Sequence, residues 1–173
     1  MADFDFLASH AESSPSKPAV ILGDTSLDFA SLNRRANRAA NVFKSLGCEA
    51  GDRVSLMSFN SVAGFEIANG VRRSGTVVVP VNYRLRGPEI AYLLNDSGAK
   101  VVVAGPDHVD AVAAAQPEVK GDRRFVAIGD RAPDGWLSYR ALMDGAAETP
   151  PSDAVGDGLL ASMMYTSGTT GHP

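Results

Sequence analysis

The sequence is poor in the residues that carry metal, redox and covalent chemistry. It has one cysteine, Cys48, and three histidines among 173 residues. A single cysteine excludes an internal disulfide, and the histidines and the cysteine do not occur at the spacing of a metal site. Cys48 lies between Gly47 and Glu49 at a predicted turn, with no histidine close in sequence to activate it. We therefore expect no nucleophilic role for its thiol.

Long apolar runs and an excess of positive charge are also missing. No stretch approaches the roughly 20 apolar residues that a membrane-spanning helix needs. The net charge is −4, from 16 basic and 20 acidic residues, which argues against binding to nucleic acid or to an anionic membrane. Residues 1–7 are acidic where a secretory signal would be basic, so the expected location is the cytoplasm.

Short apolar runs alternate with amphipathic stretches along most of the chain. Runs rich in valine, leucine and isoleucine predict buried strands, and apolar residues at three- and four-residue spacing predict helices. The expected strands are 19–22, 54–58, 77–80, 101–104, 125–128 and 159–165, and the expected helices are 28–46, 62–74, 87–97, 107–116 and 139–143. Strands joined through helices should run parallel, so we expect an α/β fold with a mostly parallel sheet flanked by helices.

Two helix faces can be assigned from their residues. In the helix over 28–46, Arg34, Arg35 and Arg38 alternate with asparagines and lack an aromatic neighbour, which favours a solvated face over an anion-binding patch. In the helix over 62–74, the stripe expected to face the core consists of Val62, Phe65, Ala68 and Val71.

One helix start is predicted from its capping residue. The helix over 107–116 is expected to be capped by Asp107.

The last residues of the chain are rich in glycine and in hydroxyl side chains. Glycines let the backbone approach a ligand closely, while serine and threonine hydroxyls and turned backbone amides donate hydrogen bonds. Such a loop can hold a polyphosphate, and here it follows a predicted strand at the end where parallel sheets usually place ligands. A P-loop of the Gly-Lys-Ser/Thr type does not fit, since no lysine occurs after Lys120. On composition alone, a flexible tail is the alternative.

The order of residues from Tyr165 to Pro173 (YTSGTTGHP) resembles the signature loop of the AMP-forming, adenylate-forming enzymes. This family includes acyl-CoA synthetases, firefly luciferase and the adenylation domains of peptide synthetases. Upstream stretches resemble the family in the right order, among them residues 32–38, 51–54, 79–85 and 96–100. The resemblance covers nearly the whole chain and is weak only between residues 106 and 158. In the family a lysine normally follows the proline, whereas this chain stops at Pro173.

The resemblance implies a two-step reaction. A carboxylate attacks the α-phosphate of ATP to give an acyl-adenylate and pyrophosphate, and a thiol, usually that of coenzyme A, then displaces AMP. The run 79–85 looks most like the fatty-acid and aromatic-acid CoA ligases, although the acyl pocket is not in this sequence. By resemblance, Mg²⁺ assists with Thr170 beside it, and the residues that contact the β- and γ-phosphates are Thr166, Ser167, Gly168, Thr169, Thr170 and Gly171.

The resemblance also implies that residues 1–173 are the front part of the large N-terminal domain, ending in the phosphate-binding loop 165–173. The rest of that domain and the mobile C-terminal domain with its catalytic lysine are expected to be absent. We therefore assign no catalytic residue and expect the chain alone not to adenylate. The strand that ends at Tyr165 would lose neighbours, which leaves an edge open to homodimer formation or to aggregation. The alternative is a non-catalytic nucleotide-binding or interaction module of the same fold.

Overall fold

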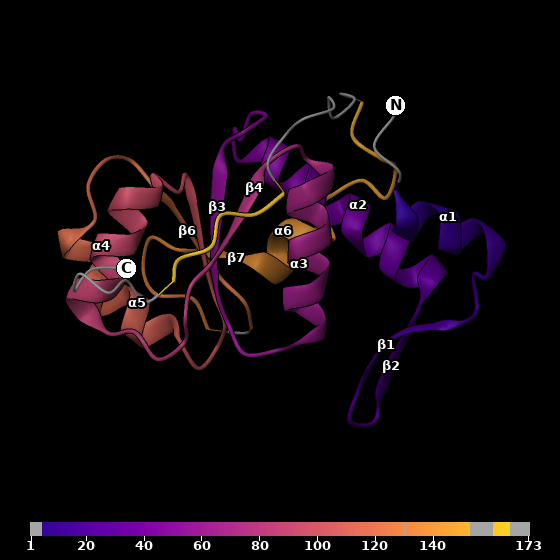
Figure 1. Ribbon diagram of the computed structural model, residues 1–173, viewed down its shortest axis with the longest axis horizontal. Helices are drawn as coiled ribbons and strands as arrows, with labels where there is room; N and C mark the ends of the chain where they lie inside the picture. Colours follow the sequence, from indigo (N-terminus) through magenta and orange to yellow (C-terminus); the bar gives the residue numbers. More distant parts are fainter. Residues whose placement is uncertain (1–4, 130, 153–160, 167–173) are drawn as a thin grey trace.

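A parallel sheet lies between two sets of helices (Figure 1) in the computed structural model, which describes residues 5–129, 131–152 and 161–166. Its five strands have the order β4-β3-β5-β6-β7, and each neighbouring pair is parallel. The expected α/β fold is therefore confirmed. The strands are β3 (Arg53–Met57), β4 (Val77–Pro80), β5 (Val101–Ala104), β6 (Arg124–Ala127) and β7 (Leu137–Ser138).

Helices cover both faces of this sheet. They are α2 (Phe29–Ser45), α3 (Val62–Arg73), α4 (Gly87–Ser97), α5 (Val109–Ala115) and α6 (Tyr139–Asp144), with a 3-10 turn η1 (Gln116–Glu118). A further helix, α1 (Phe6–Ser13), packs against α2. Figure 1 shows α4 and α5 on one side, and α2, α3 and α6 on the other. An antiparallel hairpin of β1 (Pro18–Leu22) and β2 (Thr25–Asp28) projects from these layers. None of the helices in the described ranges combines the length and the apolar character of a membrane-spanning segment.

Most helix ends follow from local chemistry that the sequence predicts. Asp28 and Ser61 cap α2 and α3 by accepting backbone amide hydrogens at 2.7 and 2.9 Å. Gly98 ends α4 with a φ of 60°, a left-handed conformation that glycine adopts without strain. The predicted cap Asp107 is wrong, because the residue that precedes α5 is His108, whose side chain makes no capping hydrogen bond.

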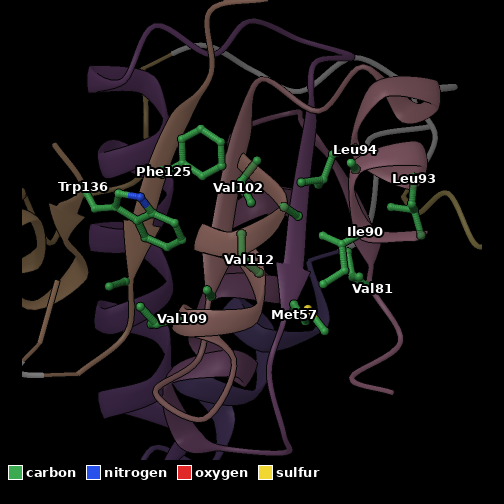
Figure 2. Close-up of a cluster of buried hydrophobic side chains, with 14 of the residues drawn as sticks. Met57, Val81, Ile90, Leu93, Leu94, Val102, Val109, Val112, Phe125 and Trp136 are labelled. Atoms are coloured by element: carbon green, nitrogen blue, oxygen red, sulfur yellow. The ribbon is translucent and has the colours of Figure 1, made fainter. Parts of the chain in front are cut away.

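Alternate residues of the strands point to opposite faces and build two apolar clusters. Figure 2 shows the cluster against α4 and α5, in which the rings of Phe125 and Trp136 pack at a tilt with centroids 5.1 Å apart. Its other buried members include Met57, Val79, Ile90, Leu93, Leu94, Val102 and Val112. The cluster against α2, α3 and α6 includes Phe43, Val54, Ile67, Val71, Val103 and Val126. Each face of the sheet is therefore covered by a helix layer, as parallel sheets require.

The apolar stripe predicted for α3 is wrong in part. Phe65 is 50% exposed, whereas Ile67, Gly70 and Val71 are buried. Gly70 lies so close to α2 that a Cβ atom added to it would be 2.3 Å from the Cβ of Ala39. The two helices therefore meet through small side chains, and a pattern based on large apolar residues does not detect such a contact.

The sequence predicted a solvated polar face for α2, but the structure shows that part of this face is covered. Asn37 is buried, and Asn37 and Asn41 donate side-chain amide hydrogens to backbone carbonyls of residues 147–149 at 2.7 to 2.9 Å. Arg38 lies 3.0 Å from the carboxylate of Glu148. This face of α2 therefore holds the segment that precedes the last part of the chain.

Candidate functional site

The described segment 161–166 leads into the predicted phosphate-binding loop and lies along the free side of β4. Ser162 forms a single parallel bridge with Val78, and the amide of Met163 donates to the Val78 carbonyl at 2.9 Å. The strand predicted over 159–165 is therefore wrong for its described part, which pairs at one position only. In Figure 1 this segment, drawn in yellow, runs from beside β4 toward α4. Homodimer formation through this edge stays a prediction.

Tyr165 fixes the other end of this segment. Its hydroxyl donates to Oδ2 of Asp96, in the last turn of α4, over 2.7 Å. The Tyr165 side chain and that of Met163 also pack against the cluster under α4 and α5. Burial, followed by the hydrogen bond to Asp96, raises the pKa of Tyr165 to about 12. The hydroxyl thus stays protonated and able to donate near neutral pH.

Thr166 is the one predicted phosphate contact within the described residues, and it is exposed. The other predicted contacts, Ser167, Gly168, Thr169, Thr170 and Gly171, lie outside the described residues. Their contacts to phosphate, and that of Thr170 to magnesium, stay predictions. In the part of the chain that is described, no group of three or more His, Cys, Asp or Glu side chains could hold a metal ion.

A second candidate surface lies where the carboxyl ends of β3 and β5 meet. The chain leaves β3 toward β4 on one side, while β5 lies on the other, so this is the point where the strand order reverses. Open α/β sheets usually bind ligands there. The two ends approach closely, because the amide of Gly105 donates to the Met57 carbonyl at 2.8 Å. A Cβ atom on Gly105 would be 2.6 Å from Oγ of Ser58, so any larger residue at this crossing would force Ser58 to shift.

Aromatic side chains gather at this crossing. The ring centroids of Phe59 and Tyr83 are 5.0 Å apart, and those of Phe59 and His108 are 4.6 Å apart. Phe59 and Tyr83 are half exposed, and the guanidinium of Arg84 lies 5.5 Å from the Tyr83 ring centroid. No sequence pattern singles out His108, but the aromatic residues Phe59 and Tyr83, each soon after a predicted strand, were a usable signal.

His108 is buried in this aromatic group, and its Nδ1 has no hydrogen-bond partner among the described residues. Burial lowers the pKa of His108, with a smaller contribution from Arg86 that the charge of Asp107 opposes. Since the unfolded chain takes up the proton near the ordinary pKa of 6.5 and the folded chain does so only at lower pH, stability should fall as the pH drops below 6.5.

We expect the substitution His108→Phe to reduce this acid-side loss of stability. Urea unfolding between about pH 8 and pH 5 would measure it, because neutral imidazole stabilises the fold only above the unfolded pKa. Comparing the two proteins at each pH cancels the other titrating groups. Parallel pH profiles for the two proteins would contradict the assignment.

The thiol of Cys48 is not part of a reactive site. Cys48 is 3% exposed. Burial, followed by the nearby carboxylate of Asp52, raises the pKa of Cys48 to about 11. A thiol that stays protonated at neutral pH is a poor nucleophile, which agrees with the sequence-based expectation.

Comparison with known proteins gives matches over nearly the whole chain. A family model described as "AMP-binding enzyme" matches residues 7–173. The chain is 40% identical over 152 residues to the long-chain-fatty-acid–CoA ligase FadD13 of Mycobacterium tuberculosis, covering 87% of this chain and 29% of that protein. It is 38% identical over 165 residues to a feruloyl-CoA synthase of Amycolatopsis sp, covering 94% of this chain and 30% of that protein.

Solved structures share the fold over the same region. The crystal structure of the anthranilate CoA ligase AuaEII in complex with anthranoyl-AMP superposes with a TM-score of 0.90 at 25% identity, over 96% of this chain and 32% of that one. A fatty acyl CoA synthetase of Mycobacterium tuberculosis gives a TM-score of 0.80 at 34% identity, over 93% of this chain and 32% of that one. The chain therefore spans about a third of the length of these proteins.

Proposed function

Because the chain belongs to the AMP-binding enzyme family, we propose that it is the front part of the large N-terminal domain of an AMP-forming acid–thiol ligase. The observation that carries this proposal is the residue order that follows Tyr165, together with the family match that extends through it to residue 173. The fold and the position of Thr166 at the end of an anchored segment are consistent with it.

In this proposal the loop binds the β- and γ-phosphates of ATP. Hydroxyl groups of Thr166, Ser167, Thr169 and Thr170 donate hydrogen bonds, and the glycines at 168 and 171 let backbone amides approach the phosphate oxygens. These donors stabilise the negative charge that builds up on the departing pyrophosphate. Magnesium, when bound, would share in neutralising this charge, with Thr170 as the proposed contact from this chain.

The proposed chemistry has two steps. A carboxylate oxygen of the acid attacks the α-phosphorus of ATP, the bond to the bridging oxygen breaks, and pyrophosphate leaves. The thiol of coenzyme A then attacks the carbonyl carbon of the acyl-adenylate, a thioester forms, AMP leaves, and the thiol proton passes to solvent. Activation is needed because a carboxylate would have to expel oxide, whereas the mixed anhydride expels AMP.

The proposed acid is a fatty or an aromatic carboxylic acid, and the proposed location is the cytoplasm. The relatives named above act on long-chain fatty acids and form feruloyl-CoA, so both classes belong in the first panel of substrates. ATP and coenzyme A are the proposed co-substrates. The residues that shape the acyl pocket are not assigned on this chain.

Product analysis of the full-length protein would test this function. The protein is incubated with ATP, magnesium, coenzyme A and one acid from the panel, and nucleotides and thioesters are identified by mass spectrometry. We expect AMP and an acyl-CoA to form in equal amounts, only when an acid is present. Formation of ADP would contradict the proposal. Binding of ATP without any product would favour the alternative, a non-catalytic nucleotide-binding module.

A further inference from the structure

The segment that leads into the proposed phosphate-binding loop is held at both of its ends. Upstream, Ser162 is bridged to Val78 on β4. Downstream, the hydroxyl of Tyr165 donates to the carboxylate of Asp96 on α4 at 2.7 Å, joining residues 69 positions apart in the sequence. The short span between Ser162 and Tyr165 is thereby fixed against two different elements of the fold.

The exposure of the side chains in this span alternates. Met163 and Tyr165 pack against the apolar cluster under α4 and α5, while Met164 is 74% exposed and Thr166 is also exposed. This alternation places neighbouring side chains on opposite sides of the chain, as in extended backbone. When Tyr165 is held against α4, the side chain of Thr166 is therefore directed away from α4 and toward solvent.

The acceptor of this hydrogen bond is itself held in place. The last turn of α4 is anchored by Leu93 and Leu94, which are 1% exposed in the cluster of Figure 2. Directly after Asp96, Nε of Arg53 on β3 donates to the carbonyl of Ser97 at 2.8 Å. Asp96 is thus carried by a helix end that is tied to the central strands of the sheet.

We propose that Tyr165 and Asp96 form a tether that positions the start of the phosphate-binding loop. Tyr165 acts as a positioning residue, since its own side chain is turned toward α4, and it acts through the direction that it gives to Thr166. The inference rests on the proposed function only in naming ATP as the ligand. The tether itself rests on the hydrogen bond, the packing of Tyr165 and the alternation along the span.

The test uses the full-length protein and the variants Tyr165→Phe, Asp96→Ala and Asp96→Asn. Tyr165→Phe keeps the ring and removes the donor, whereas Asp96→Asn keeps an oxygen acceptor. We expect Tyr165→Phe and Asp96→Ala each to raise the KM for ATP in pyrophosphate exchange about three- to tenfold, as expected for losing one hydrogen bond. The KM for the acid should not change. Asp96→Asn should restore most of the loss, and the double variant should be no worse than either single one.

Met164→Ala is the matched control, because this exposed side chain lies in the same span and should leave both KM values unchanged. An unchanged KM for ATP in Tyr165→Phe, or additive effects in the double variant, would overturn the tether. Binding of tripolyphosphate, measured by calorimetry on the same proteins, does not depend on the reaction and should weaken by the same factor. If the variants weaken tripolyphosphate binding but the protein catalyses no pyrophosphate exchange, the proposed function is refuted and the tether is retained. Absence of tripolyphosphate binding by the parent protein would refute the tether, while the exchange reaction would still decide the proposed function.

Discussion

Replacing Gly70 by alanine is expected to destabilise the fold by about 2 kcal/mol or more, because the added methyl group overpacks the contact between α2 and α3. The new Cβ would lie 2.3 Å from the Cβ of Ala39 and 2.9 Å from the backbone nitrogen of Ala40, and both alanines are fully buried. Backbone atoms cannot move aside as a flexible side chain can. The gain in helix propensity, about 1 kcal/mol for glycine to alanine, offsets only part of this cost.

Urea unfolding of the Gly70→Ala protein would measure the effect, with Gly145→Ala as the control. A Cβ atom on Gly145 would meet nothing within 4 Å, so that variant should differ from the parent by less than about 0.5 kcal/mol. Adding Ala39→Gly to Gly70→Ala removes the closest contact and should recover part of the loss. Equal stabilities for Gly70→Ala and Gly145→Ala would show that the helices do not meet as described.

Replacing Arg73 by methionine is expected to cost about 3 kcal/mol, since it removes a nearly buried charge that joins three helical segments. The Arg73 side chain is 11% exposed and donates to Oδ2 of Asp5 at 2.9 Å, just before α1. It also donates to the backbone carbonyl and the side-chain oxygen of Asn33 at 2.9 and 2.6 Å, and to Oδ1 of Asn37 at 2.7 Å. Methionine would leave these acceptors without their donor.

Arg72→Met is the matched control, because Arg72 is the exposed neighbour on the same helix and surface substitutions usually change stability by less than about 0.5 kcal/mol. Most of the expected loss for Arg73 comes from the asparagine contacts, since the Asp5 side chain is 42% exposed and its ion pair is screened by water. Urea unfolding and amide exchange along α1 would measure both variants. Unchanged exchange along α1 in Arg73→Met would contradict this network.

The parallel sheet could be predicted because its strands are short runs of branched apolar residues between turn signals. The runs around Val54, Val78, Val102 and Val126 are buried or half-buried and paired in parallel as expected. Two strands and one helix were missed because they bury few apolar residues or are very short. The hairpin strand β2 has no buried residue, β7 has two residues, and α1 buries only Leu7, so none of them shows a clear apolar pattern.

The candidate site was predicted from residue order alone. A local motif does not reveal contacts between residues that are distant in the sequence. The hydroxyls and glycines after Tyr165 predict a phosphate-binding loop, but no sequence pattern connects Tyr165 to Asp96 across 69 positions. The expected strand ending at Tyr165 was wrong in its described part for the same reason. Beyond the bridge at Ser162, the segment turns to α4, where Tyr165 finds its hydrogen-bond acceptor and apolar neighbours.

Exchange of radiolabelled pyrophosphate into ATP, without coenzyme A, tests the central claim most directly, because it reports reversible acyl-adenylate formation alone. The full-length protein and the 173-residue chain should be compared across fatty and aromatic acids. We expect acid-dependent exchange by the full-length protein and none by the 173-residue chain. Exchange by the short chain would contradict our assignment of catalysis to residues outside it. No acid-dependent exchange by a folded, ATP-binding full-length protein would contradict the proposed function.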